Sequence, residues 1–164
     1  MNTQKLTRKS VEAIQNAQSI AVSNSNQQID TLHLLLSLLT QQEGLIPQLL
    51  KSMGIDEAAM AEQTEKSVSA LPKVTGSGRR PDEVYITQDT DRVLNYAEET
   101  AERMGDEYVS VEHIFLSLLK YPNRQITELL NNADRRFLAI TNVEIYPKNS
   151  NQPPKRYEFL EIHM

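Results

Sequence analysis

Cysteine and tryptophan are absent from this chain of 164 residues. Without cysteine there is no disulfide bond and no thiolate metal site, which fits a protein that works in a reducing compartment. Glycine is also scarce, with 5 residues. The cluster Gly76–Arg80 is too short for a phosphate-binding loop and lacks its lysine, so the sequence contains no nucleotide-binding motif and no ATPase core.

An excess of basic residues is missing as well. The chain has 17 Lys and Arg against 22 Asp and Glu, for a net charge of −5 and a pI near 5.2. Because nucleic-acid binding depends on clustered basic side chains, we predict no nucleic-acid partner. The first twenty residues mix polar and apolar positions, which is not typical of a signal peptide or a membrane anchor. We expect a soluble cytoplasmic protein with no membrane partner.

No arrangement of side chains predicts catalysis. The acidic pairs Glu98-Glu99 and Asp106-Glu107 are typical of solvated helix surface and turn, and no nucleophile lies beside a base. His33 and His113 precede apolar runs near helix starts, where a ring nitrogen commonly bonds a backbone group. His163 stands alone near the end of the chain. We therefore predict no enzyme activity, no metal site and no cofactor.

What the chain does contain is one pattern written twice, 80 positions apart. The matching segments are Leu6-Thr7 and Ile86-Thr87, Ala13-Ile14 and Val93-Leu94, and His33–Leu39 and His113–Leu119. The register holds without insertions into Ile46 and Ile126. One helical unit has therefore been duplicated.

The first copy predicts four helices. Apolar residues recur at helical spacing after Thr7, a plausible N-cap, and the run 32–39 is apolar nearly all round, as in the centre of a bundle. Asp30 or Thr31 can cap that central helix. Pro47 suits the first turn of a short third helix that ends at Met53-Gly54. Asp56 begins a fourth helix, which Pro72 stops.

The second copy repeats this order only in part. Thr87 and Ser110 are expected caps, but after Ala133 the correspondence ends, and residues 137–146 suit either a distorted helix or a strand. Residues 147–164 suit a short hairpin or a flexible tail equally. We predict one domain over 1–146, comprising repeat one at 1–71, a linker at 72–84 and repeat two at 85–146, divergent after 133, followed by a tail at 147–164.

These segments in this order resemble a known family. The matching motifs are Lys5–Gln18, His33–Leu36, Leu45-Ile46-Pro47 before Gly54, Leu71–Val74, Val93–Asn95 and Gly105–His113. From Met1 to about Ala133, the chain resembles the double Clp repeat found at the N-terminus of Clp AAA+ chaperones, and within them the ClpB disaggregases. The resemblance covers about four-fifths of the chain.

The resemblance implies an all-α, pseudo-twofold bundle of two four-helix Clp repeats, which the duplication also favours. It implies a chaperone domain of the stress response that binds unfolded or aggregated polypeptide for a hexameric ATPase whose modules this chain lacks. An alternative is a docking module for a dedicated adaptor protein. A third is an enzyme or an autonomous fragment with a new role conferred by the divergent C-terminus. We expect the isolated domain to be a monomer.

The family's substrate groove carries over onto five positions of this chain. Thr7, Asp106 and Glu112 correspond to polar positions of the groove, and Leu94 and Tyr96 to its apolar lining. Each position also has a structural interpretation. Thr7 is a helix cap, Asp106 a turn residue, Glu112 an acid favoured by the helix dipole, and Leu94 a core residue.

Overall fold

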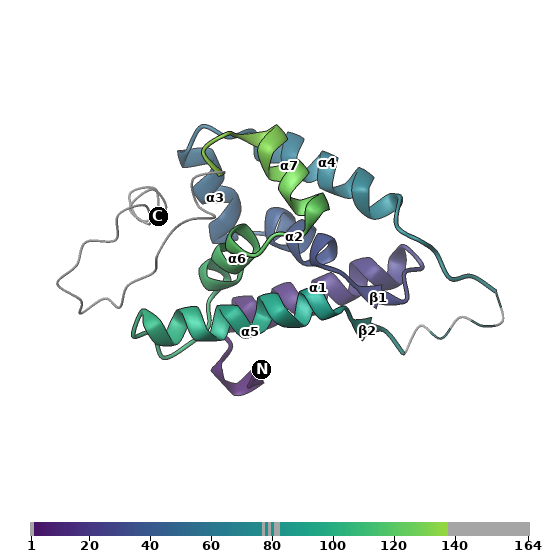
Figure 1. The fold of residues 1–164 in the computed structure, drawn as a ribbon, viewed down its shortest axis with the longest axis horizontal. Helices are drawn as coiled ribbons and strands as arrows, with labels where there is room; N and C mark the ends of the chain where they lie inside the picture. Colours follow the sequence, from purple (N-terminus) through teal and green to yellow (C-terminus); the bar gives the residue numbers. More distant parts are fainter. Residues whose placement is uncertain (1, 77, 79, 81–82, 138–164) are drawn as a thin grey trace.

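The computed structural model describes residues 2–76, 78, 80 and 83–137. It contains seven α-helices within these ranges (Figure 1). They are α1 (Arg8–Ser23), α2 (Thr31–Thr40), α3 (Leu45–Ser52), α4 (Glu57–Ser69), α5 (Gln88–Arg103), α6 (Val111–Lys120) and α7 (Arg124–Ala133). A 3-10 turn, η1 (Thr3–Lys5), precedes them. The all-α bundle is confirmed, while the eighth helix, the residues 138–146 and the predicted tail lie outside the described residues.

The helices begin where the sequence predicts. Thr7 Oγ1 accepts the Ser10 amide, Asp56 caps α4, and Thr87 caps α5 by accepting the Thr90 amide. Asp30, rather than Thr31, caps α2. Gly54 lies beyond α3 with a positive φ of 75°, a conformation that glycine adopts without steric cost.

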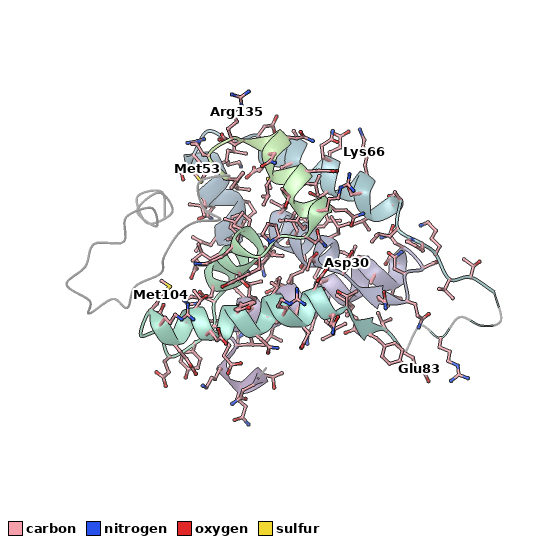
Figure 2. The ribbon with its side chains drawn as sticks, in the orientation of Figure 1. Asp30, Met53, Lys66, Glu83, Met104 and Arg135 are labelled. Atoms are coloured by element: carbon pink, nitrogen blue, oxygen red, sulfur yellow. The ribbon has the colours of Figure 1, made fainter. Side chains whose placement is uncertain are left out.

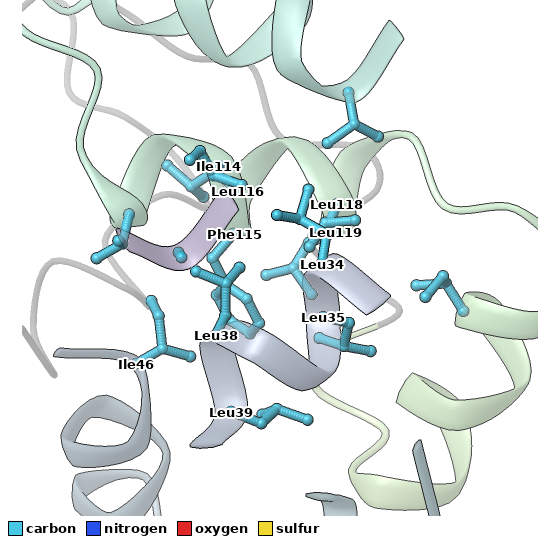
Figure 3. Packing of buried hydrophobic residues seen from close by; sticks show 14 of the residues in the cluster. Leu34, Leu35, Leu38, Leu39, Ile46, Ile114, Phe115, Leu116, Leu118 and Leu119 are labelled. Carbon is cyan, nitrogen blue, oxygen red and sulfur yellow. The ribbon is translucent and has the colours of Figure 1, made fainter. Parts of the chain in front are cut away.

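The core lies around the two helices that are apolar nearly all round. Every residue of α2 except Thr40, and every residue of α6 except Glu112 and Lys120, is buried. Leu34 and Leu38 of α2 and Phe115 of α6 gather between the two helices (Figure 3). This packing confirms the prediction that the duplicated apolar runs form the centre of the bundle.

The sequence did not predict the two short strands. β1 (Gln28–Ile29) and β2 (Tyr85–Ile86) pair in parallel, and each precedes a helix. At the position related to this pair by the duplication, Leu6 and Val109 form a single parallel bridge. In each repeat, the segment before the first helix therefore pairs with the segment before the second helix of the other repeat. This reciprocal pairing gives the bundle its pseudo-twofold arrangement.

The two repeats diverge after Ala133, where α7 ends, and the next residues hold this helix end in place. Arg136 binds the Asp134 carboxylate at 2.9 Å and also donates to the backbone carbonyl of Met53, at the end of α3. This guanidinium holds the pKa of Asp134 below its usual range. Phe137 is buried in the core. The first residues of the divergent segment therefore fasten α7 to repeat one.

Candidate functional site

Three of the five predicted site residues meet where α1 and α6 begin. The Thr7 amide donates to the carbonyl of Val109 at 3.1 Å, and Ser10 Oγ donates to the same carbonyl at 2.8 Å. Ser110, the next residue, caps α6, and its hydroxyl donates to the Glu112 carboxylate. Two helix N-termini therefore lie on either side of one strand-like segment, with Glu112 in the first turn of α6, where the helix dipole favours an acid.

A buried histidine holds the third residue, Asp106. His113 Nδ1 accepts the Ser110 backbone amide at 2.9 Å, so this nitrogen carries no proton. The other nitrogen, Nε2, therefore carries the proton and donates to Asp106 Oδ2 at 2.9 Å. Figure 2 marks Met104, the C-cap of α5, two residues before Asp106. The bond to the Ser110 amide is the one predicted for a packing histidine, and the bond to Asp106 holds that carboxylate near the surface.

The same arrangement occurs in repeat one with different chemistry. His33 Nδ1 accepts the Asp30 amide at 2.9 Å, and Nε2 bonds Asn26 Oδ1 at 2.9 Å. His33 is fully buried, and this burial lowers its pKa below the usual 6.5. Asn26 and Leu32 occupy the positions equivalent to Asp106 and Glu112. The pair of acids is therefore a feature of repeat two alone.

Further charges lie around this place. Lys5 Nζ lies 3.8 Å from Glu98 and 3.5 Å from Glu102, and the Lys5 carbonyl accepts the Val109 amide at 2.7 Å. Sequence reasoning missed these residues because the partners are up to 104 positions apart and no local pattern joins them. We name the site formed by Thr7, Asp106 and Glu112 the acidic rim.

The two predicted apolar residues differ in burial. Leu94 is 6% exposed and belongs to the core, as its structural interpretation stated. Tyr96 is half-buried and stacks on Tyr121, with ring centroids 3.7 Å apart and an angle of 11° between the rings. Residues two positions apart on a helix point in different directions. A common apolar floor of Leu94 and Tyr96 stays a prediction.

An apolar hollow adjoins the repeat-one histidine instead. The cavity has a volume of about 340 Å³, and Leu71, Val74 and Tyr85 are among its lining residues. Tyr85 and Val74 are also among the exposed large hydrophobic residues of the described chain. The sequence placed Leu71 at the end of repeat one and Val74 in the linker, and it gave no signal that Val74 would lie against repeat one.

Across the described ranges, no group of three or more His, Asp or Glu side chains could hold a metal ion. Within the same ranges, no helix is long and apolar enough to cross a bilayer.

Comparison with known proteins supplies a family. The model of the Clp repeat (R) N-terminal domain matches residues 5–133. The chain is 35% identical over 165 residues to the chaperone protein ClpB of Bacillus cereus, covering 98% of this chain and 19% of that protein. It is 41% identical over 122 residues to ClpB of Nitratidesulfovibrio vulgaris, covering 74% of this chain and 14% of that protein. The chain thus spans less than a fifth of the length of these relatives.

Solved structures share the fold. The Hsp104 N-terminal domain of Candida albicans has a TM-score of 0.71 at 18% identity, covering 90% of this chain and 99% of that one. The N-terminal domain of ClpD from Arabidopsis thaliana has a TM-score of 0.66 at 21% identity, covering 86% and 92%. A ClpV N-domain in complex with a VipB peptide has a TM-score of 0.62 at 18% identity, covering 82% of each chain.

Proposed function

The chain belongs to the family of Clp repeat N-terminal domains, and from that premise we propose that it is the non-catalytic, client-binding domain of a ClpB-like disaggregase. Its match is to the N-terminal domain of these chaperones, so nucleotide hydrolysis belongs to modules outside this chain. We propose that unfolded or aggregated polypeptide binds at the acidic rim, with Tyr96 and the edge of Leu94 as apolar contacts.

The observation that carries this proposal is that Thr7 and Glu112 bond the segment Val109-Ser110 and that Asp106 bonds His113, whose ring accepts the Ser110 amide. Repeat one forms its equivalent helices without carboxylates at these positions, which hold Asn26 and Leu32. The helices therefore do not need the two acids in order to form. Two acids held at the surface by their own hydrogen bonds favour basic side chains of a client. Because these contacts require no fixed register, they suit clients of many sequences.

Such binding is weak at one domain. Burying one or two client side chains contributes roughly 1.5–3 kcal/mol each, before the cost of ordering the client, which leaves affinities in the millimolar to micromolar range. In a hexamer, several tethered copies raise the effective concentration of sites around one client. Weak and reversible contact is therefore compatible with delivery to a central motor.

The test replaces both acids by their amides. We expect Asp106→Asn with Glu112→Gln to weaken binding of a basic, permanently unfolded model protein about five- to tenfold, since two partly exposed charge contacts are lost. In repeat one the amide of Asn26 bonds His33 as Asp106 bonds His113. We therefore expect the asparagine of the double variant to keep the bond to His113. Titration by fluorescence anisotropy measures the affinity.

A matched control removes the same charge elsewhere. Glu62→Gln with Glu65→Gln changes two exposed acids of α4, away from the acidic rim. We expect this variant to bind like the unaltered chain. Equal affinities of both double variants for the client would contradict the assignment of the acidic rim.

The second candidate is docking of a dedicated adaptor. The solved complex of a ClpV N-domain with a VipB peptide shows a protein of this fold bound to a peptide of a defined partner. The exposed side chains of Tyr85, Ile86 and Val74 offer this chain an apolar surface for a folded partner. Recovery of one folded partner at equal stoichiometry, together with no affinity for an unfolded reporter, would favour the adaptor role.

A further inference from the structure

The interface of α1 and α2 in repeat one contains a cleft that neither proposed role uses. Its volume is about 430 Å³, within the range of ligand pockets. The small residues Ala13 and Ser37 line it together with the polar side chains of Asn16, Gln41 and Glu12. We name this feature the α1–α2 cleft.

Repeat two has the same frame around the equivalent place. Ser37 Oγ donates to the Ala13 carbonyl at 2.6 Å, and Ser117 Oγ donates to the Val93 carbonyl at 2.6 Å, 80 positions later. These matching bonds show that the helix pair α1–α2 of repeat one and the helix pair α5–α6 of repeat two pack in the same register. Side chains at equivalent positions can therefore be compared directly.

The comparison shows what the α1–α2 cleft lacks. Asn16 and Gln41 in repeat one correspond to Tyr96 and Tyr121 in repeat two, and those two rings stack at 3.7 Å. Repeat two thus fills this part of the frame with aromatic rings. In repeat one, two shorter amide side chains leave it open.

The lining of the α1–α2 cleft favours a ring that carries a hydrogen-bond donor. Gln41 is 8% exposed, and its Nε2 donates to the Lys9 carbonyl at 2.9 Å. Its other polar atom, Oε1, is buried and has no hydrogen-bond partner within the described chain. An unsatisfied buried acceptor is unfavourable, and a ligand donor would satisfy it once the Gln41 side chain turns to bring Oε1 into the cleft.

The charge of the cleft narrows the ligand further. Glu12 is its ionisable lining residue, and its equivalent in repeat two is Arg92. Glu12 pairs with Lys9 Nζ at 3.8 Å, so the cleft carries little net charge and suits a neutral ligand. A neutral phenol has an apolar ring, a polar end and few rotatable bonds to order. We propose that the α1–α2 cleft binds the side chain of a tyrosine on a partner polypeptide, with the phenol hydroxyl donating to Gln41.

The test uses three small probes that differ in one side chain. Isotope-labelled full chain is titrated with N-acetyl-tyrosinamide, N-acetyl-phenylalaninamide and N-acetyl-leucinamide, and backbone amide shifts are followed by NMR. We expect saturable shifts on α1 and α2 around Ala13, Ser37 and Gln41 for the tyrosine probe, with millimolar affinity. The phenylalanine probe should bind at least about fivefold more weakly because it has no donor for Gln41, and the leucine probe should not saturate.

A filled cleft provides the matched variant. Asn16→Tyr adds the ring that repeat two has at this position, and we expect it to abolish the saturable shifts. Gln18→Tyr adds the same ring at an exposed position of α1 outside the lining, and this control should bind like the unaltered chain.

A second measurement needs no variant. Contacts between the ring protons of the probe and the Ala13 methyl group, detected as intermolecular NOEs in the unaltered chain, should accompany binding. Equal affinity for all three probes, shifts that map away from α1 and α2, or no such NOEs would overturn the proposal. Because no unfolded client is present, this result is separate from the outcome at the acidic rim.

Discussion

His33 connects a single buried side chain to the stability of the whole fold. It is fully buried, its Nδ1 already accepts a backbone amide, and burial lowers its pKa below 6.5. The sequence predicted this bonding role because the histidine precedes an apolar helix. It did not show that the partner would be the amide of Asn26 in one repeat and the carboxylate of Asp106 in the other.

We expect the free energy of unfolding to fall as the pH drops below about 6.5, because the unfolded chain binds a proton there that folded His33 resists. The loss should continue until the lowered folded pKa is reached, with a slope of at most about 1.4 kcal/mol per pH unit from this group. Urea unfolding between about pH 7.5 and pH 5 measures it. The variant His33→Gln should be less stable throughout but have a shallower slope, and an unchanged slope would contradict this account.

At the scale of elements, the short segments before the helices join the two repeats through buried hydrogen bonds. Thr90 Oγ1 donates to the Ile29 carbonyl at 2.9 Å, as Ser10 Oγ donates to the Val109 carbonyl at 2.8 Å. Each bond joins the first helix of one repeat to the segment before the second helix of the other. The helices themselves were predictable from caps and apolar spacing, but these crossing bonds were not, because they join residues 61 and 99 positions apart.

Thr90→Ala should lower the free energy of unfolding by roughly 1–2 kcal/mol, since a buried crossing hydrogen bond and a contact with the Thr87 cap are lost. Thr90→Ser keeps the hydroxyl and should cost less than half as much. Chemical denaturation compares the two variants. A similar loss for both would indicate that packing of the Thr90 methyl group, and not the hydroxyl, stabilises the contact.

The turn at Gly105 is a second test at this scale. Gly105 has a φ of 74°, and a Cβ added there would meet no atom within 4 Å. We expect Gly105→Ala to cost about 1 kcal/mol from backbone strain alone. Chemical denaturation measures the loss, and an unchanged free energy of unfolding would contradict backbone strain at this turn.

At the scale of the molecule, the two repeats share one core. α2 of repeat one packs against α6 of repeat two, and Arg136 fastens the end of α7 to α3. We therefore expect one cooperative unfolding transition, with midpoints that coincide by far-ultraviolet and near-ultraviolet circular dichroism. Two separate midpoints, one for each repeat, would contradict a shared core.

The monomeric state also belongs to this scale. The exposed large hydrophobic residues of the described chain are Val74, Tyr85, Ile86 and Tyr108, and none of them lies on α6 or α7. The helices α6 and α7 therefore offer no exposed large hydrophobic side chain to a second copy. We expect light scattering to give the mass of a single chain, and a stable dimer would overturn this prediction.

The sequence by itself determined the duplication, the helix starts and the apolar runs, because each is a local pattern of spacing and capping that the chain carries wherever it lies in space. It also determined the family, because those patterns recur in order over residues 5–133. The tertiary structure decided which distant residues meet. It brought Thr7 to Val109, placed Leu94 in the core, and left open in repeat one the space that two tyrosines fill in repeat two. Such outcomes depend on how two similar repeats pack against each other, and packing is a property of surfaces that no single segment contains.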